Sequence, residues 1–445
     1  MKAIIVGNGK SGKAAFELLK SENVEVSFLK QEDIDAKFFE KEYLDRLLKG
    51  LSFIVKSPGV PYDVEILKEV KNRKIKIVGE FELGAKRLQG DVIAVTGTNG
   101  KTTTVSLINF LLNGGNQKIF KGGNIGIPVS SFCKETKKED ISVLECSSFQ
   151  LENISKFRPK ISAILNLSPD HLNRHKTFKN YIDCKKNIAK NQTENDYLLI
   201  NADEEILMKN LPKTKAKIFY FSTKKIVKGC YLKRGNIYFN DNLISKKIAS
   251  VKDIKIVGEH NLSNALCATL AVWLETHDEE ILKRLKDFSA VEHRIEFVSK
   301  INQISFYNDS KATNILSTLS AIKSFKCGIN LILGGSDKGC DFDEFFAKTP
   351  KNIENIAIFG ETRQKIAFSA QKYGFKNFYI CDTLKASTLL LYQLAKEGEI
   401  VLLSPACASF DCFENYEERG NCFKKIVKEI ENESVLFDSS KKINV

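Results

Sequence analysis

The stretch from residue 92 to residue 104 reads Val92-Ile93-Ala94-Val95-Thr96-Gly97-Thr98-Asn99-Gly100-Lys101-Thr102-Thr103-Thr104, an apolar strand followed by a glycine-containing turn. Such a turn between a strand and a helix points backbone N–H groups at an anion. Lys101 can reach the outer phosphates of a nucleotide, and Thr102 or Thr103 can offer a hydroxyl to Mg²⁺. Val95 stands where the usual P-loop has its first glycine, which makes this turn tighter. The stretch predicts a nucleotide-phosphate site.

The size and composition of the chain indicate a soluble protein of several domains. At 445 residues the chain has room for about three domains. No stretch approaches the ~18 consecutive apolar residues of a membrane span, and the apolar run at residues 3–6 is too short for a secretion signal. The 11 cysteines include no Cys-x-x-Cys pair, which favours reduced thiols over disulfides or a zinc ribbon. We therefore expect a cytoplasmic protein without a membrane span.

The formal charge of +13 at pH 7 is compatible with a polyanionic partner. Lysine is spread along the whole chain, and no cluster of arginine and aromatic residues marks a nucleic-acid groove. We therefore expect no nucleic-acid partner and interpret the charge as solvated surface that also favours polyanionic small substrates. The alternative is a P-loop motor stimulated by DNA or RNA, whose binding would depend steeply on salt.

Strand-like and helix-like segments alternate along the chain, a pattern typical of α/β folds with parallel sheets. We expect three domains: a Rossmann-like domain at residues 1–88, a P-loop-type central domain at 89–290 and a second Rossmann-like domain at 291–445. Strands are expected at residues 2–6, 24–29, 51–56, 75–78, 141–146, 161–167, 304–307, 331–333, 356–359 and 401–403. The last helix is expected over residues 421–431, with a frayed tail from residue 439.

A Gly-x-Gly-x-x-Gly pattern at residues 7–12 follows the first expected strand and opens a helix, as in nicotinamide-dinucleotide sites. Such sites carry an acidic residue at the end of the second strand, where this chain has Lys30 and Gln31. The nearest acidic residues, Glu32 and Asp33, come after the position at which such sites carry the ribose-binding carboxylate. The pattern predicts a diphosphate on the helix N-terminus that need not belong to NAD.

Polar residues end the expected strands of the central part, at the edge where open α/β sheets bind ligands. Glu145 stands at such a strand end and, combined with the glycine turn, is placed to hold Mg²⁺. His171 forms a His-x₃-His pair with His175, which could suggest zinc on a helix, but three or four ligands are needed. Ligand and structural roles for His171 are equally consistent with the sequence. Lys185, on a helical stretch, is not distinguished from a solvated lysine.

Two asparagines near the end of the central part, Asn261 and Asn264, lie three residues apart on one helix face. Their amides either pair with an adenine edge or cap the helix. Further along, residues 308–314 form a polar loop after an expected strand. Within it, Asp309 can accept two ribose hydroxyls, and a lysine can neutralise phosphate charge.

These motifs together resemble the Mur ligase family, which joins amino acids to the cell-wall precursor. The likeness spans nearly the whole chain, in the right order, and within the family it is strongest to the D-glutamate-adding members. The segments that carry it are residues 96–102 (Thr-Gly-Thr-Asn-Gly-Lys-Thr), 123–126 (Gly-Asn-Ile-Gly), 145–151 (Glu-Cys-Ser-Ser-Phe-Gln-Leu), 170–172 (Asp-His-Leu), 293–294 (His-Arg), 308–314 (Asn-Asp-Ser-Lys-Ala-Thr-Asn) and 403–411 (Leu-Ser-Pro-Ala-Cys-Ala-Ser-Phe-Asp).

The resemblance implies catalytic roles for Lys101, Glu145, His171 and Lys185. It implies two Mg²⁺ sites, one at Thr102 and Glu145 and one at His171 and Lys185, with Lys185 carrying a carbamate. A carbamate converts an amine into the oxygen donor that a hard cation prefers. The residues implied to bind ATP are Gly97, Thr98, Asn99, Gly100, Lys101, Thr102, Thr103, Asn261, Asn264, His293, Arg294, Asp309 and Lys311.

The resemblance further implies an ATP-dependent ligase that joins D-glutamate to UDP-N-acetylmuramoyl-L-alanine through an acyl phosphate and acts as a monomer. Lys30-Gln31 departs from the acidic residue usual near uracil, which puts the uracil contact in doubt. The residues implied to bind the UDP-sugar or the amino acid are Lys10, Ser11, Asn124, Ser147, Thr313, Lys338, Ser409, Phe410 and Tyr416. The closest rivals are other amino-acid-adding Mur ligases. Folate-polyglutamate ligase lacks a first domain such as residues 1–88, and a non-catalytic scaffold has no reason to combine Glu145, His171 and Lys185.

Overall fold

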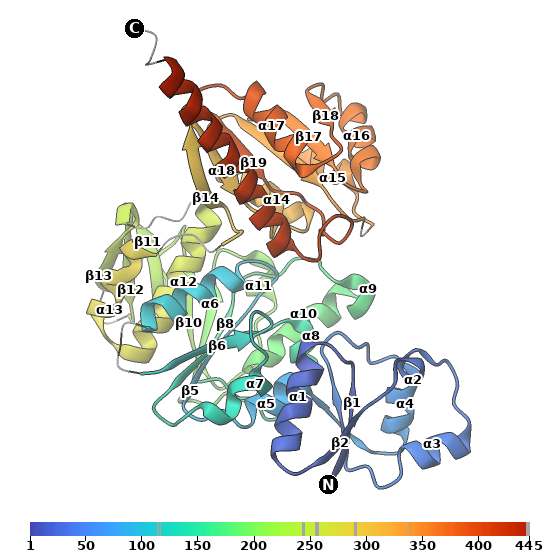
Figure 1. Cartoon of the computed structure of the whole chain (residues 1–445). Coiled ribbons are helices and arrows are strands. Elements are labelled where there is room, and N and C mark those ends of the chain that lie inside the picture. The colour runs from blue at the N-terminus through green and yellow to red at the C-terminus, as the bar shows by residue number, and fades with distance from the viewer. Residues whose placement is uncertain are drawn as a thin grey trace. The chain divides into compact units, whose positions relative to one another are not determined.

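The computed structural model describes residues 1–441 except 114, 116, 243–244, 254–257, 289–291 and 338, and it describes no side chains at 253, 259 and 434–441. The chain forms two compact units, Met1–Ile254 with Ser263–Phe288 and Lys255–Leu262 with Ser289–Val445. Two sheets belong to the first unit and one to the second (Figure 1). The expected α/β class is confirmed, while the domain boundaries at residues 88 and 290 stay predictions. Within the described residues, no helix combines the length and the apolar character that crossing a bilayer requires.

The first sheet has four parallel strands in the order β2-β1-β3-β4. Each strand lies within two residues of its expected position. The strands are β1 (Lys2–Val6), β2 (Glu25–Phe28), β3 (Phe53–Lys56) and β4 (Lys76–Gly79), and the helices are α1 (Lys10–Ser21), α2 (Gln31–Asp35), α3 (Lys41–Leu47), α4 (Glu65–Asn72) and α5 (Glu80–Ala85). Helices α1 and α5 contact α7 (Val129–Phe132), which joins this sheet to the next within one unit.

The second sheet has nine strands in the order β13-β12-β11-β10-β9-β8-β5-β7-β6. Strands β6 to β11 pair in parallel, and β12 and β13 add an antiparallel edge. The strands are β5 (Asp91–Thr96), β6 (Ile119–Gly123), β7 (Ile141–Glu145), β8 (Ile161–Ile164), β9 (Tyr197–Asn201), β10 (Lys217–Ser222), β11 (Gly229–Lys233), β12 (Asn236–Asn240) and β13 (Ser245–Ser250). The remaining helices of this unit are α6 (Lys101–Leu112), α8 (Ser148–Leu151), α9 (Leu172–His175), α10 (Phe178–Lys186), α11 (Glu205–Lys209), α12 (Glu259–Thr276, whose start falls in the second unit) and α13 (Glu279–Lys283).

The strand expected at residues 161–167 was too long, because β8 ends at Ile164. Its neighbour β5 ends at Thr96, the residue paired with Ile164, and the chain turns away at Gly97. The residues beyond β8 bond to the turn instead: the Thr98 N–H donates to the Asn166 carbonyl at 3.1 Å. The apolar run therefore leaves the sheet after Ile164, and Asn166 bonds to the turn that follows β5.

The third sheet has six strands in the order β14-β15-β19-β16-β17-β18, parallel except for the β14–β15 pair. The strands are β14 (Glu296–Ile301), β15 (Ile304–Asn308), β16 (Ile329–Gly334), β17 (Ile353–Phe359), β18 (Phe378–Ile380) and β19 (Ile400–Leu403). The helices are α14 (Ile315–Ile322), α15 (Phe342–Lys348), α16 (Arg363–Lys372), α17 (Leu384–Leu394) and α18 (Tyr416–Lys441).

The expected bounds of the last helix were wrong at both ends. Helix α18 begins at Tyr416, runs through Gly420 and continues to Lys441, while residues 442–445 lie outside the described residues. Gly420 lies inside the helix at a point where the His293 ring packs against its backbone. A Cβ at this position would lie 2.2 Å from Nδ1 of His293. Apolar residues at helical spacing, Phe423, Val427 and Ile430, hold the helix on the sheet.

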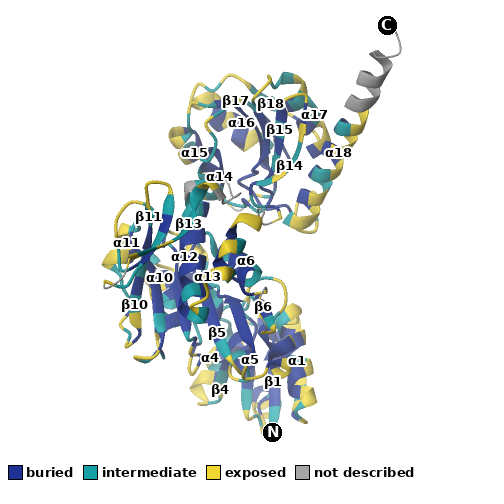
Figure 2. Ribbon diagram, turned by 90° about the vertical axis from the view of Figure 1, so that its left-hand side faces the viewer, coloured by how far each residue is buried: buried dark blue, intermediate teal, exposed yellow. Residues whose placement is uncertain are grey.

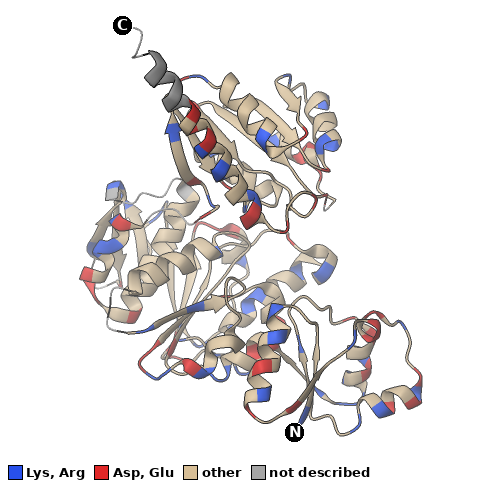
Figure 3. Ribbon diagram, viewed as in Figure 1, with Lys and Arg blue, Asp and Glu red and all other residues tan. Residues whose placement is uncertain are grey.

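The strands at the centre of the sheets are the most buried elements (Figure 2). All five residues of β7 and all six of β16 are buried, as expected for parallel strands covered by helices on both faces. Basic and acidic residues are interspersed on the described elements (Figure 3), which agrees with the interpretation of the net charge as solvated surface. Because the strands of the second sheet around β5 are parallel, their carboxyl ends share one edge.

Candidate active site

The predicted phosphate turn connects β5 to α6, and two of its glycines occupy backbone conformations that favour glycine. Gly100 has φ 84° and Gly97 has φ 153°. A Cβ on Gly100 would lie 2.3 Å from Oδ1 of Asn264, so this turn and helix α12 approach closely. The two predicted nucleotide residues Gly100 and Asn264 are thus neighbours in the first unit.

The side chain of Lys101 folds over the turn at the N-terminus of α6. Its Nζ donates to the carbonyls of Gly97 and Thr98, both at 2.8 Å. The side chain of Asn166, which was not predicted as a site residue, holds the backbone of the turn through two hydrogen bonds. Its Oδ1 accepts from the Asn99 N–H at 2.8 Å, and its amide donates to the Asn99 carbonyl at 3.1 Å. An ammonium group and the amino end of a helix therefore meet at one point, which is a favourable place for phosphate.

Glu145, at the end of β7, lies between two other predicted residues. Its buried carboxylate accepts from the Thr102 hydroxyl through Oε2 and from the Asn124 amide through Oε1, both at 2.8 Å. Of the two hydroxyls that the sequence left open, Thr102 is the one that bonds to Glu145. The structure thus joins the predicted ATP turn, the first metal site and the UDP-sugar region through one carboxylate.

Lys185 is buried in α10, with 2% of its surface exposed. Its Nζ donates to the Gly97 carbonyl at 2.7 Å and lies 4.7 Å from the centre of the Tyr181 ring. Burial lowers the pKa of the Lys185 ammonium well below its usual value, and the positive charge of Lys101 lowers this pKa further. The adjacent Lys186 is more exposed, at 27%, and pairs with Asp183. Burial therefore distinguishes two lysines that sequence physics could not.

His171 is placed differently from its partner in the His-x₃-His pair. It precedes α9 with φ 51°, its side chain is 52% exposed, and its ring lies 4.9 Å from Phe149 and near Asp170. His175 is buried at the end of α9 and bonds through Nε2 to the Ser148 hydroxyl at 2.9 Å. The zinc helix that this spacing could suggest does not form, because α9 begins only after His171.

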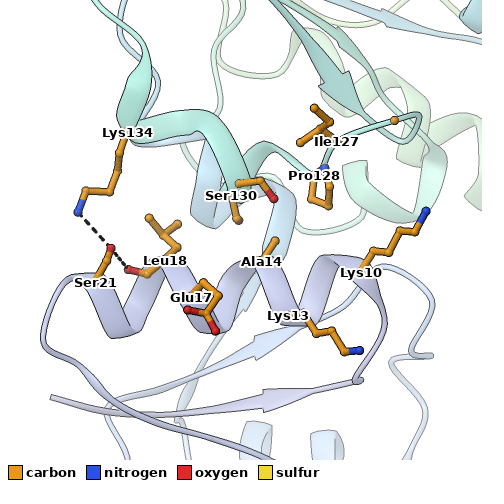
Figure 4. Close-up of a pocket in the computed structure, with 12 residues that line it drawn as sticks. Lys10, Lys13, Ala14, Glu17, Leu18, Ser21, Ile127, Pro128, Ser130 and Lys134 are labelled. Carbon is orange, nitrogen blue, oxygen red and sulfur yellow. Dashed lines mark hydrogen bonds between the residues drawn. The ribbon is translucent and has the colours of Figure 1, made fainter.

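Two of the predicted UDP-sugar residues, Lys10 and Ser11, lie in the first turn of α1. Lys10 is at one end of a groove of about 580 Å³ between α1 and residues 126–134, and Lys134 is at the other end (Figure 4). The groove has an apolar wall that includes Leu18 and Ile127. The segment 126–134 begins two residues after Asn124, so the groove extends from the predicted UDP-sugar region along α1.

In the second unit, Asp309 is buried where β15 ends. Its Oδ2 accepts from the Ser404 hydroxyl at 2.8 Å and its Oδ1 from the Ile295 N–H at 3.3 Å. Burial raises the pKa of the Asp309 carboxyl to about 7, and these hydrogen bonds and the nearby Arg294 only partly offset it. Lys311 lies 4.8 Å from the centre of the Tyr416 ring, which places a predicted nucleotide residue beside a predicted substrate residue.

Replacing Asp309 with asparagine should remove a pH dependence of stability. The folded pKa of about 7 exceeds the ordinary value of 3.8, so unfolding releases a proton between these pH values and stability falls as pH rises through this window. From about pH 5 to about pH 8, the wild-type protein should lose roughly 3 kcal/mol more unfolding free energy than Asp309→Asn. Urea denaturation at several pH values measures this difference, and parallel curves for the two proteins would contradict it.

The residues predicted to bind D-glutamate, and the predicted substrate residues Ser147 and Phe410, lie in both units or outside the described residues. Ser147 caps α8 in a capping box with Gln150. Ser409 is buried and Phe410 is 69% exposed in the second unit, Thr313 is half-buried, and Lys338 lies outside the described residues.

Arg419, which was not predicted as a site residue, holds two loops of the second unit together. Arg419 is fully buried and donates to the carbonyls of Ser310, Cys407 and Ala408 and to the Ser310 hydroxyl. It thereby connects the predicted nucleotide loop at residues 308–314 to the loop that follows β19. No pattern in the sequence marks it, because it stands among charged residues that resemble a solvated helix face.

Two family descriptions match most of this chain. Residues 95–272 match the family described as Mur ligase middle domain, and residues 293–407 match Mur ligase, glutamate ligase domain. The chain is 44% identical over 387 residues to the UDP-N-acetylmuramoylalanine--D-glutamate ligase of Thermoanaerobacter sp. (strain X514), covering 86% of this chain and 85% of that protein. It is 38% identical over 448 residues to the protein of the same name from Lachnoclostridium phytofermentans, covering 97% and 99%.

Solved structures show the same fold at low identity. One is UDP-N-acetylmuramate-alanine ligase MurC from Thermotoga maritima, with a TM-score of 0.60, 18% identity and coverage of 96% of this chain and 99% of that one. Another is MurF ligase from Thermotoga maritima in complex with ADP, with a TM-score of 0.57, 19% identity and coverage of 89% and 94%.

Proposed function

This chain belongs to the Mur ligase family, and from that premise we propose that it joins D-glutamate to UDP-N-acetylmuramoyl-L-alanine in an ATP-dependent step of peptidoglycan precursor synthesis. The observation that carries the proposal is the hydrogen-bonded series Thr102–Glu145–Asn124. It connects the predicted ATP turn to a predicted UDP-sugar residue, as a reaction between these two substrates requires. The protein is proposed to act as a cytoplasmic monomer.

The reaction is a ligation in two steps. The alanyl carboxylate of the UDP-sugar attacks the γ-phosphorus of ATP, so that a C–O–P link forms and ADP leaves. The amine of D-glutamate then attacks the acyl carbon, a C–N bond forms, and phosphate departs with the electrons of the broken C–O bond. The amine proton passes to solvent. Several anionic groups meet in this reaction, so neutralisation of charge should dominate catalysis.

The first predicted metal site fits Mg²⁺ because its donors are hard oxygens. The hydroxyl of Thr102 and the carboxylate of Glu145 lie within 2.8 Å of each other and are buried. Bound Mg²⁺ would neutralise phosphate charge in both steps. Lys101, at the N-terminus of α6, would pair with the β- and γ-phosphates, exchanging its contacts with the turn carbonyls for the nucleotide.

The second predicted metal site depends on a modified lysine. Carbamylation needs a neutral amine, and the buried Lys185 is suited to it because its ammonium form is disfavoured. Among the described residues no ion pair holds Lys185, in contrast to Lys186. We propose that Lys185 carries the carbamate and that His171 completes this site, as the resemblance implies.

The other substrate groups are assigned to residues in both units. Asn261, Asn264, His293, Arg294, Asp309 and Lys311 would bind the adenosine and the phosphates. The UDP-sugar would contact Lys10, Ser11 and Asn124. The residues proposed for D-glutamate are Thr313, Lys338, Ser409 and Tyr416, and Ser147 and Phe410 are proposed as substrate-binding residues.

Phosphate release with varied amino acids tests this function. With UDP-N-acetylmuramoyl-L-alanine and Mg·ATP present, D-glutamate should support release of one phosphate for each ligated product. L-Alanine, L-lysine and diaminopimelate should support little release, since each lacks the carboxylate geometry of D-glutamate. A preference for one of those amino acids would assign the chain to another member of the family. Stimulation of ATP hydrolysis by DNA or RNA, without ligation, would overturn the proposal altogether.

A further inference from the structure

Three side chains with different metal-binding atoms meet outside the predicted ATP and Mg²⁺ sites. Glu152 follows α8, His175 ends α9, and Cys184 lies in α10. One ligand atom from each lies within 4.8 Å of the other two. We refer to these residues as the Glu152–His175–Cys184 cluster. We propose that this cluster binds a borderline divalent cation of the Zn²⁺ class, independently of the Mg²⁺ that serves ligation.

The orientation of His175 supports a ligand role. Its Nε2 is bonded to the Ser148 hydroxyl, so Nε2 can carry the ring proton and leave the Nδ1 lone pair available. Its ring is held between Phe149 and Tyr181, with centroid distances of 5.4 Å to each. A hydrogen bond on the far nitrogen is the arrangement that fixes a metal-binding imidazole. Burial also lowers the pKa of His175, which favours the neutral ring that a cation needs.

The distances around Nδ1 of His175 are close to those of a coordinated cation. Sγ of Cys184 lies 3.7 Å away and Oε1 of Glu152 lies 3.8 Å away. Tetrahedral Zn²⁺ would require about 3.6 Å between nitrogen and sulfur and about 3.4 Å between nitrogen and oxygen. The two edges that meet at Nδ1 of His175 therefore need shifts of only a few tenths of an ångström, and the ligand atoms of Cys184 and Glu152 lie within 4.8 Å of each other. A fourth position is left for water.

The donor set favours Zn²⁺ over Mg²⁺. Thiolate and imidazole are preferred by borderline cations, whereas Mg²⁺ prefers oxygen ligands. Burial raises the pKa of the Cys184 thiol to about 11, so the cation must displace its proton to solvent before sulfur bonds as a thiolate. The two anionic ligands match the two charges of the cation, while Arg174 and Lys56 add positive charge beside the Glu152 carboxylate.

Arg174 would compete with the cation for Glu152. Its guanidinium contacts Oε2 at 2.9 Å and Oε1 at 3.3 Å, so the oxygen that faces His175 is the more weakly held. The same guanidinium donates to the Val60 carbonyl at 2.9 Å, in the loop after β3. Occupation of the cluster should therefore displace the Arg174 guanidinium from Glu152, and loss of Arg174 should strengthen cation binding.

Titration of the metal-free, reduced full-length protein with Co²⁺, followed by displacement with Zn²⁺, tests the proposal. We expect one tight equivalent of Co²⁺ with thiolate-to-cobalt absorption. Cys184→Ser should abolish this absorption and weaken Zn²⁺ binding at least about 10-fold, and His175→Gln should weaken it similarly. Arg174→Gln should tighten Zn²⁺ binding. Cys412→Ser, at an exposed cysteine, is the matched control and should bind as wild type does.

The outcomes separate this site from others in the chain. His171→Ala, which alters the predicted Mg²⁺ site, should leave the thiolate absorption unchanged. Thermal unfolding of each variant establishes that it is folded, and the agreement of two variants at different positions guards against a local packing effect. Thiolate absorption that is absent from the wild-type protein, or that persists in Cys184→Ser, would overturn the proposal whether or not the chain is a ligase.

Discussion

Lys101→Ala should lower kcat/KM for ligation by about 10³-fold while the protein remains folded. The ammonium of Lys101 stands at the N-terminus of α6, where the proposed phosphates gather, and no other lysine shares the turn at residues 97–103. Its Nζ donates to two carbonyls of its own turn, and the loss of these two hydrogen bonds should cost the fold only about 1–2 kcal/mol. Phosphate release under single-turnover conditions measures the activity, and thermal unfolding measures the stability.

The control for this variant is Lys138→Ala, which removes an exposed lysine from the same unit. It should leave both rate and stability near wild type, which would separate the local effect of Lys101 from a general loss of positive charge. Wild-type turnover by folded Lys101→Ala would contradict the assignment of this turn as the phosphate site.

Lys185→Ala should lower kcat by about 10²–10³-fold, because the proposed carbamate and its metal-binding oxygens are lost. A carbamate is a carboxylate attached to an amine, so acetate added to Lys185→Ala should restore part of the rate by entering the space left by the side chain. Acetate should not help the wild-type protein. Loss of the Lys185–Gly97 hydrogen bond should cost the fold only about 1–2 kcal/mol, since the buried amine is itself unfavourable in its charged form.

Lys186→Ala is the matched control, one residue away in the same helix. Lys186 is more exposed and pairs with Asp183, so its replacement should leave activity near wild type. If Lys186→Ala were inactive and Lys185→Ala active, the carbamate would be assigned to the wrong lysine. If acetate failed to restore Lys185→Ala while its fold was intact, the lysine would act as something other than a carboxylate-like ligand.

The turn and its carboxylate could be predicted from the sequence for a topological reason. Consecutive apolar strands in an α/β chain pair in parallel, and their carboxyl ends meet at one edge. Glycines, Lys101 and Glu145 all follow such strands, and the structure places Glu145 within hydrogen-bond distance of Thr102. The strand pattern alone was therefore enough to predict that these residues meet at one edge of the sheet.

The supporting residues could not be predicted, because their roles arise from tertiary packing. Asn166 lies in an apolar run that predicts a buried strand. Its role is visible only in the structure, where the strand ends before it and its amide bonds to the Asn99 backbone. The choice between Lys185 and Lys186 is a matter of burial on a short helix, which spacing alone does not decide. A glycine in a helical sequence usually indicates an end, yet Gly420 lies inside α18 because a histidine ring packs against it.

A crystal structure with Mg²⁺ and a non-hydrolysable ATP analogue tests the central claim most directly. We predict that the β- and γ-phosphates lie against residues 97–103, with Lys101 turned toward them and a metal ion in contact with Thr102 and Glu145. A nucleotide bound away from this turn, or a Glu145 carboxylate directed away from both nucleotide and metal, would contradict it.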